Sequence, residues 1–208
     1  MKPIQFIGTI VDVRIEIWES NLFLFNISLI FNRLDLALYD INKAIEFDRE
    51  NTIFYDNRAY LYLFYEIDRY VWRKLEKYNK ALEDYNIIIG FNPENVKVLI
   101  NRAFCYAKME IYDEAVNDYS RVLDIEPANT HALYNRAISY DKISKLNEAI
   151  VDFSKIIEIE PMNANAYLNR GCCYEKLQKV ELAYKDYEAS LLIDKILENM
   201  EQQKGNEK

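Results

Sequence analysis

Apolar positions recur along much of this chain with the period of an α-helix. Ala115, Tyr119 and Val122 are spaced i, i+4 and i+7, and the residues 34 positions further along repeat that spacing with Ala149, Phe153 and Ile156. Side chains at those intervals share one face of a helix, because 3.6 residues complete each turn. The pattern therefore predicts amphipathic helices, each with one face to bury against a neighbour.

The period of 34 residues extends to residues of several other kinds. Asn, Arg and a small residue occur together once in each unit, and Tyr follows the small residue by three positions. The members are Asn101-Arg102-Ala103, Asn135-Arg136-Ala137 and Asn169-Arg170-Gly171 with Tyr106, Tyr140 and Tyr174; Ala81, Ala115, Ala149 and Ala183; Asp84, Asp118, Asp152 and Asp186; and Pro93, Pro127 and Pro161. A fixed period of this length indicates a repeat architecture, in which each unit buries its apolar face only by stacking on the next.

This order of small residue, Tyr, Ala, aromatic residue and Pro resembles the tetratricopeptide repeat. The resemblance implies an all-α fold class, in which tetratricopeptide-like helix-turn-helix repeats stack in a right-handed solenoid. In each repeat a first helix, A, is followed by an antiparallel second helix, B, which we expect the proline to end. Asn95, Asn129 and Asn163 follow the prolines and are suited to cap the next helix A. We assign the motif arginines to structure, pairing with the Asp of helix B; they are Arg102, Arg136, Arg170 and, in the motif Asn57-Arg58-Ala59, Arg58.

The repeats divide the chain into six predicted segments. These are an irregular N-terminal region with a degenerate repeat (1–48), a repeat with an insertion (51–93), three regular repeats (95–127, 129–161 and 163–194), and a C-terminal capping helix end with a polar tail (195–208). In the degenerate repeat, residues 34–48 look like helix B, and Asn21–Phe31 would be its helix A.

Ten extra residues interrupt the second segment. Asn57 precedes Asn101 by 44 residues instead of 34, which places the insertion between Tyr65 and Arg73. Tyr65, Tyr70 and Trp72, with nearby basic residues, could form an aromatic contact arm. One alternative is that the insertion simply extends the helices and packs on the degenerate repeat, and another is a mis-joined coding segment.

Charge and cysteine usage restrict the classes of partner. The chain has 34 acidic and 26 basic side chains and a net charge of -8, which disfavours nucleic acid and anionic lipid as partners. Three cysteines, two of them adjacent, match neither a disulfide framework nor zinc-ligand spacing and indicate reduced thiols in a cytoplasmic setting. The richest apolar stretch, Leu22–Phe31, is too short to span a bilayer, so we expect no membrane partner.

Catalytic chemistry has little to be built from. His131 is the only histidine, the four glycines are isolated, and the most regular carboxylates recur once per repeat. We therefore expect no catalytic residues, no cofactor and no metal site.

The resemblance implies a protein-binding scaffold whose concave groove is lined by the A helices. Helical spacing places the motif Asn on one stripe with the residues four before and seven after it. The candidate groove residues are Asn57, Lys97, Asn101, Lys108, Asn135, Lys142, Asn169 and Lys176. An Asn amide can pair with any backbone peptide group, and Lys attracts carboxylates. Packing between repeats is an alternative role for the asparagines, and the helix dipole is one for the lysines.

The partner is a protein or peptide whose identity the sequence leaves open, and three other functions remain as alternatives. One is a self-associating structural subunit, a homo-oligomer in which the apolar region Ile4–Phe31 docks on another copy. Another is a chaperone co-factor: Lys97, Asn101 and Asn135 are similar to residues with which that subgroup holds the terminal carboxylates of heat-shock chaperones. Asn165 and Asn169 depart from its pattern, because Lys and Arg are needed there. The third is an RNA-binding helical repeat, against which the acidic charge speaks.

Overall fold

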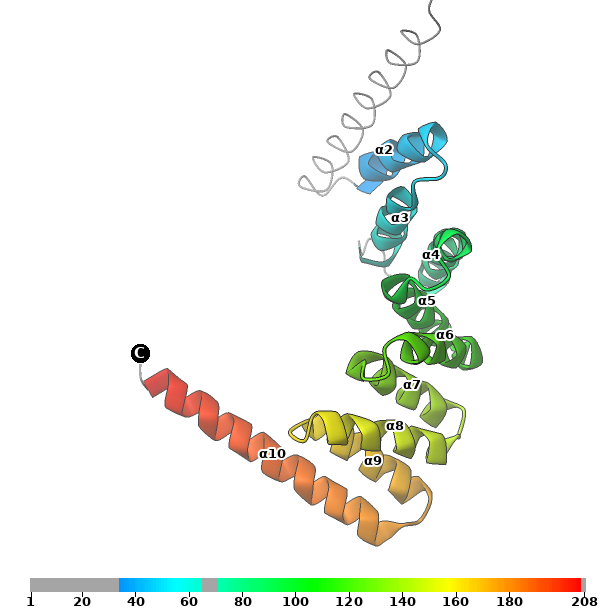
Figure 1. Cartoon of the computed structure of the whole chain (residues 1–208). Coiled ribbons are helices and arrows are strands. Elements are labelled where there is room, and N and C mark those ends of the chain that lie inside the picture. Colours follow the sequence, from blue (N-terminus) through cyan, green and yellow to red (C-terminus); the bar gives the residue numbers. More distant parts are fainter. Residues whose placement is uncertain (1–33, 65–70, 207–208) are drawn as a thin grey trace, which may run out of the picture. The chain divides into compact units, whose positions relative to one another are not determined.

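A computed structural model describes residues 34–64 and 71–206, and within these ranges the regular secondary structure is helical throughout (Figure 1). The helices are α2 (Leu34–Phe47), α3 (Thr52–Phe64), α4 (Val71–Phe91), α5 (Val96–Lys108), α6 (Tyr112–Ile125), α7 (Thr130–Lys142), α8 (Leu146–Ile159), α9 (Ala164–Lys176) and α10 (Val180–Asn206). The all-α prediction is confirmed. The chain divides into two compact units, 1–98 and 99–208, which are considered separately.

Three predicted features of the N-terminal part lie wholly or partly outside the described residues. These are the helix over Asn21–Phe31, the apolar region Ile4–Phe31, and most of the insertion, residues 65–70.

In the second unit the helices pack in chain order. α6 contacts α7, α7 contacts α8, α8 contacts α9, and α9 contacts α10. Turns of three or four residues separate consecutive helices, which makes neighbours antiparallel. This unit is thus a helical-repeat solenoid, with α7 and α9 as A helices and α6, α8 and α10 as B helices.

The core of this unit consists of the positions that the period selects. Ala115, Tyr119 and Val122 of α6 are fully buried, and so are their counterparts in α8. On α9 the small residue of the motif lies against the aromatic residue of helix B. A Cβ atom at Gly171 would lie 2.7 Å from Cε1 of Tyr187, so a glycine leaves room for the ring at this position.

Each regular repeat turns from helix A to helix B in the same way. Glu110, Ser144 and Gln178 have φ values of 62°, 61° and 59°, and each follows the end of an A helix. The next residue's N–H donates to the carbonyl of the motif Tyr, as from Lys145 to Tyr140 at 2.8 Å. Such a bond closes the C-terminus of a helix through one left-handed residue.

The predicted N-caps are confirmed. Oδ1 of Asn129 accepts from the N–H of Ala132 at 2.9 Å, and Asn95 and Asn163 make equivalent bonds to Val98 and Ala166. α4, α6 and α8 end two residues before Pro93, Pro127 and Pro161, as expected for prolines that stop helix B.

The first unit contains α2, α3 and α4. α2 occupies the predicted second helix of the degenerate repeat and buries Ala37, Ile41 and Ala44. α3 has 13 residues, like α5, α7 and α9, whereas α4 has 21 residues against 14 in α6 and α8. The described part of the insertion therefore lengthens the start of helix B.

Candidate functional site

The most regular polar contact is an ion pair between the motif Arg of helix A and the Asp of helix B. Arg136 donates from Nε to Oδ2 and from Nη2 to Oδ1 of Asp152, at 2.8 and 2.7 Å. The same two-point pair joins Arg58 to Asp84, Arg102 to Asp118, and Arg170 to Asp186. The four Asp side chains are only 2%, 2%, 4% and 6% exposed. The structural assignment of these arginines is confirmed.

The third guanidinium nitrogen reaches across to the preceding helix B. Nη1 of Arg136 donates to Oγ of Ser120 on α6, and Nη1 of Arg170 donates to Oγ of Ser154 on α8, both at 3.0 Å. In the first unit Nη1 of Arg58 donates to Oδ1 of Asn42 at 2.6 Å. One guanidinium thus fixes helix A to its own helix B and to the one before it. The acceptor always lies two residues after the repeated Asp, an offset that the sequence analysis did not use.

The ion pair raises the pKa of the arginine. The hydrogen bond to Asp186 raises the pKa of Arg170, and the bond to Asp118 does the same for Arg102. These pairs are occupied by the fold, so they are not free to bind a ligand.

The predicted asparagines lie on the exposed side of the A helices and are half-buried. Nδ2 of Asn135 donates to the carbonyl of His131 at 2.8 Å, and Nδ2 of Asn169 donates to the carbonyl of Asn165 at 2.7 Å. Nδ2 of Asn169 also donates to the Tyr134 hydroxyl at 3.0 Å, which places α7 beside α9 on this face. Among the described residues no donor reaches the Oδ1 atoms of Asn135 and Asn169, so these oxygens can accept from a ligand.

Asn57 and Asn101 hold the same repeat position on α3 and α5, in parts of the chain that belong to different units. Within the described residues their side-chain amides make no hydrogen bond, so donor and acceptor are both available.

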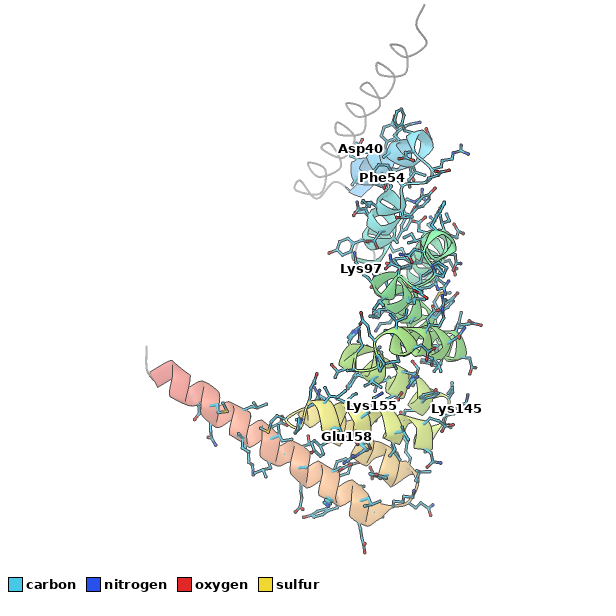
Figure 2. The ribbon with its side chains drawn as sticks, viewed as in Figure 1. Asp40, Phe54, Lys97, Lys145, Lys155 and Glu158 are labelled. Carbon is cyan, nitrogen blue, oxygen red and sulfur yellow. The ribbon has the colours of Figure 1, made fainter. Side chains whose placement is uncertain are left out.

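The candidate groove lysines fall into two classes, those paired with a carboxylate and those without such a partner in the described ranges. Nζ of Lys97 donates to Asp56 at 2.6 Å, and Nζ of Lys176 donates to both carboxylate oxygens of Asp141 at 2.6 and 2.7 Å (Figure 2 shows Lys97). Lys108 lies 5.1 Å from the ring centroid of Phe104, and Lys142 is exposed. In the described ranges neither Lys108 nor Lys142 has a carboxylate partner.

The neighbouring A helix accounts for the difference between Lys142 and Lys176 in the second unit. Asp141 stands 35 residues before Lys176, and the residue 35 before Lys142 is Ala107. The carboxylate of Asp141 neutralises Lys176. Ala107 offers Lys142 no such partner, so the ammonium of Lys142 stays available. Of the lysines in this unit, Lys108 and Lys142 are the candidates for contact with a ligand.

Beside the asparagines the A helices carry an apolar strip that the sequence analysis missed. It consists of the residues one before and three after the motif Asn in the second unit: Ile100, Phe104, Tyr134, Ile138, Leu168 and Cys172. All are partly or fully exposed, with Phe104 at 37% and Leu168 at 44%. The signal in the sequence was available, because these positions are apolar in each of the three repeats and follow the i, i+4 spacing.

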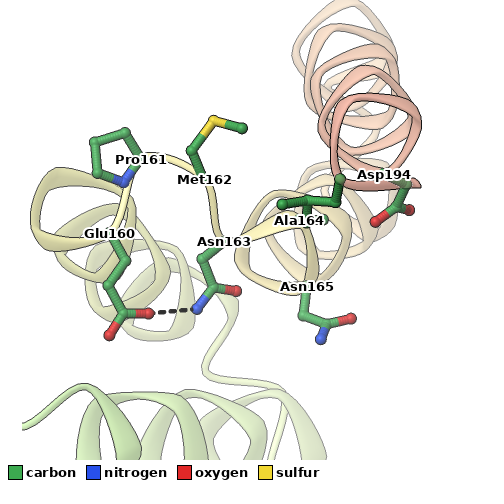
Figure 3. A pocket seen from close by; sticks show the side chains of 8 residues that line it. Glu160, Pro161, Met162, Asn163, Ala164, Asn165 and Asp194 are labelled. Atoms are coloured by element: carbon green, nitrogen blue, oxygen red, sulfur yellow. Dashed lines mark hydrogen bonds between the residues drawn. The ribbon is translucent and has the colours of Figure 1, made fainter. Parts of the chain in front are cut away.

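A pocket of about 550 Å³ lies where the α8–α9 turn approaches α10 (Figure 3). Its lining includes Glu160, Asn163 and Asp194, and Nδ2 of Asn163 donates to Oε2 of Glu160 at 2.7 Å. Asn163 is also the N-cap of α9, so its polar atoms are already used by the fold.

The described part of the chain shows no group of three or more His, Cys, Asp or Glu side chains arranged to hold a metal. His131 is exposed at the start of α7. The three cysteines are free, and burial raises the pKa of the Cys105 thiol to about 12. No helix among the described residues is long and apolar enough to cross a membrane.

Comparisons with known proteins agree with this geometry. Residues 96–129, 130–163 and 164–196 match family models described as tetratricopeptide repeat. No curated protein matches the chain in sequence.

Among solved structures, a crystal structure of MamA is 16% identical, with a TM-score of 0.74 over 85% of this chain and 97% of that one. YrrB, described as a TPR protein with an unusual peptide-binding site, is 21% identical, with a TM-score of 0.68 over 81% of this chain and 82% of that one. A tetratricopeptide repeat protein from Parabacteroides merdae is 21% identical, with a TM-score of 0.72 over 85% of this chain and 66% of that one. At these identities the structural likeness concerns the fold.

Proposed function

Because the chain is a tetratricopeptide repeat protein and thus a protein-interaction scaffold, we propose that its non-catalytic function is to bind a peptide on the A-helix face of the second unit. We name this face the groove and define it by Asn101, Asn135 and Asn169, the two lysines Lys108 and Lys142, and the apolar strip. The observation that carries the proposal is the free Oδ1 of Asn135 and Asn169 beside exposed apolar side chains.

The hydrogen bonds of the asparagines suit recognition of a peptide backbone. Each Nδ2 is held by the carbonyl one helical turn earlier, which fixes the direction of the amide and leaves its oxygen without a donor among the described residues. An oriented oxygen accepts from a peptide N–H with little additional loss of side-chain entropy. The asparagines would therefore fix the backbone of a ligand whatever its side chains are.

The neighbouring side chains define which peptides fit. Phe104, Ile138 and Leu168 offer apolar surface for an aliphatic or aromatic anchor, which is the usual source of binding energy. Lys108 and Lys142 are cations without a carboxylate partner among the described residues, so they favour acidic side chains near the anchor. The expected ligand is a peptide with one large apolar residue flanked by Asp or Glu.

A terminal-carboxylate clamp of the chaperone type receives less support. It would use the ammonium of Lys97, which is bonded to Asp56 at 2.6 Å.

The test is a selection of random peptides displayed on phage against the full chain, followed by affinity measurement of the selected peptides. Ile138→Asp and Lys142→Glu should each weaken binding at least tenfold. The matched controls are Val151→Asp and Lys155→Glu on α8, which introduce the same acidic residues at exposed positions off the A helices (Figure 2 labels Lys155). If the selected peptides bind the two groove variants as tightly as the two α8 control variants, the groove is not the binding site.

A further inference from the structure

The last helix of the described array, α10, exposes a face that on the earlier B helices α6 and α8 is covered by the following A helix. α10 follows α9 without a further helix packed against it in the described part of the chain, as Figure 1 shows. Val180, Tyr184 and Leu191 on this face are 69%, 63% and 61% exposed. Leu123, which holds the position of Leu191 two repeats earlier, is 8% exposed, because α7 packs against α6.

The same face carries an acceptor for an arginine. Ser120 and Ser154 each accept from Nη1 of the arginine on the following helix A, at 3.0 Å. Glu188 occupies that repeat position on α10 and is exposed, and the Tyr184 hydroxyl is hydrogen-bonded to its carboxylate. A carboxylate accepts from a guanidinium more strongly than a hydroxyl does.

From this correspondence we propose that the exposed face of α10, defined by Val180, Tyr184, Glu188 and Leu191, docks an amphipathic helix of a partner protein that carries an arginine. The helix would lie as α7 lies on α6 and as α9 lies on α8. Its apolar side chains would cover Tyr184 and Leu191, and its arginine would bind Glu188. This interface is separate from the groove and does not depend on what the groove binds.

Two features favour a foreign basic helix over a symmetric pair of α10 helices. Within the described residues the partner of the Glu188 carboxylate is the Tyr184 hydroxyl and no cation, so Glu188 favours a cation opposite. Two copies of the face would bring Glu188 near its own equivalent. Glu in place of Ser also adds a negative charge at a position whose counterparts, Ser120 and Ser154, already accept from a guanidinium, so it strengthens the preference for a cationic donor. The arginine is therefore the feature that selects the partner.

The chain itself supplies a probe for this surface. The segment 129–145 contains α7 with Arg136, which binds Ser120 in the equivalent interface. An isolated helix this short is only marginally stable in water. The probe is therefore a peptide of this sequence that carries a hydrocarbon staple, which holds it helical, and a fluorescent label. Fluorescence anisotropy with the full chain then measures docking directly.

We expect saturable binding that falls at least tenfold with Glu188→Lys or Leu191→Asp in the chain, and also with Arg136→Ala in the peptide. Glu158→Lys is the matched control on α8, and Phe104→Ala in the groove should also leave binding unchanged, which separates this site from the proposed function (Figure 2 labels Glu158). Circular dichroism would verify that each variant is folded.

Absence of saturable binding, or binding that is indifferent to both α10 variants, would overturn the proposal. A concentration-dependent mass of the chain alone that Glu188→Lys abolishes would overturn it as well, because the occupant would then be a second copy.

Discussion

The ion pair between Arg136 and Asp152 provides the sharpest test of how the array is held together. The Asp152 side chain is 4% exposed, and it accepts both Nε and Nη2 of Arg136. The variant Asp152→Ala leaves the guanidinium with its bond to Ser120 and without a countercharge. Breaking a buried ion pair by removing one partner costs about 3–5 kcal/mol. The Arg136 side chain keeps 20% exposure, so water reaches it and the expected loss is about 3 kcal/mol, the lower end of that range.

The assay is urea denaturation followed by circular dichroism, with thermal melting as a second measurement. For a chain of this size a loss of 1 kcal/mol lowers Tm by about 2–4 °C, so we expect a decrease of about 6–12 °C. The matched control is Asp141→Ala, which removes the partner of the half-exposed Lys176 and should cost no more than about 1 kcal/mol.

A double variant tests the physical reason for the cost. Arg136→Met with Asp152→Leu removes both charges, so it should recover most of the lost stability, since a buried pair is often replaceable by apolar residues. A loss below about 1 kcal/mol for Asp152→Ala, or one equal to the loss for Asp141→Ala, would show that these pairs do not hold the repeats together.

Three further results are expected. Asn129→Ala removes the side-chain acceptor of the Ala132 N–H and should lower the free energy of unfolding by about 1 kcal/mol in urea denaturation; no loss would mean that water replaces the cap. Ser144→Gly relieves a side chain at φ 61° and should raise that free energy by about 0.5–1 kcal/mol, whereas a decrease would show that the left-handed turn is not strained. The pKa of buried Cys105 is raised to about 12 from an ordinary value of 9.0, so the unfolded chain loses this proton first as pH rises. Stability should therefore fall between pH 9 and 12, and Cys105→Ala should make this fall shallower by about 1.4 kcal/mol per pH unit; equal slopes would refute the burial of the thiol.

The sequence alone determined the repeat architecture of this protein, because each repeat must meet the same local demands. The i, i+4 and i+7 spacing of Ala115, Tyr119 and Val122 predicted their burial, and Asn129 and Pro127 marked where helices begin and end. Such signals depend on residues close together in the chain. Hence a single sequence with a strict period was enough to predict them.

Only the tertiary structure decided which polar side chains remain available. Lys176 and Lys142 hold the same repeat position, and the carboxylate of Asp141 on the neighbouring A helix reaches only Lys176. Likewise Arg136 binds two B helices at once, a contact that the period by itself does not assign. Leu191 is apolar like its counterpart Leu123, yet it is exposed, because burial depends on whether a further helix packs against it. Whether a side chain is free to contact a ligand depends on its neighbours in space, and the stacking of the helices determines those neighbours.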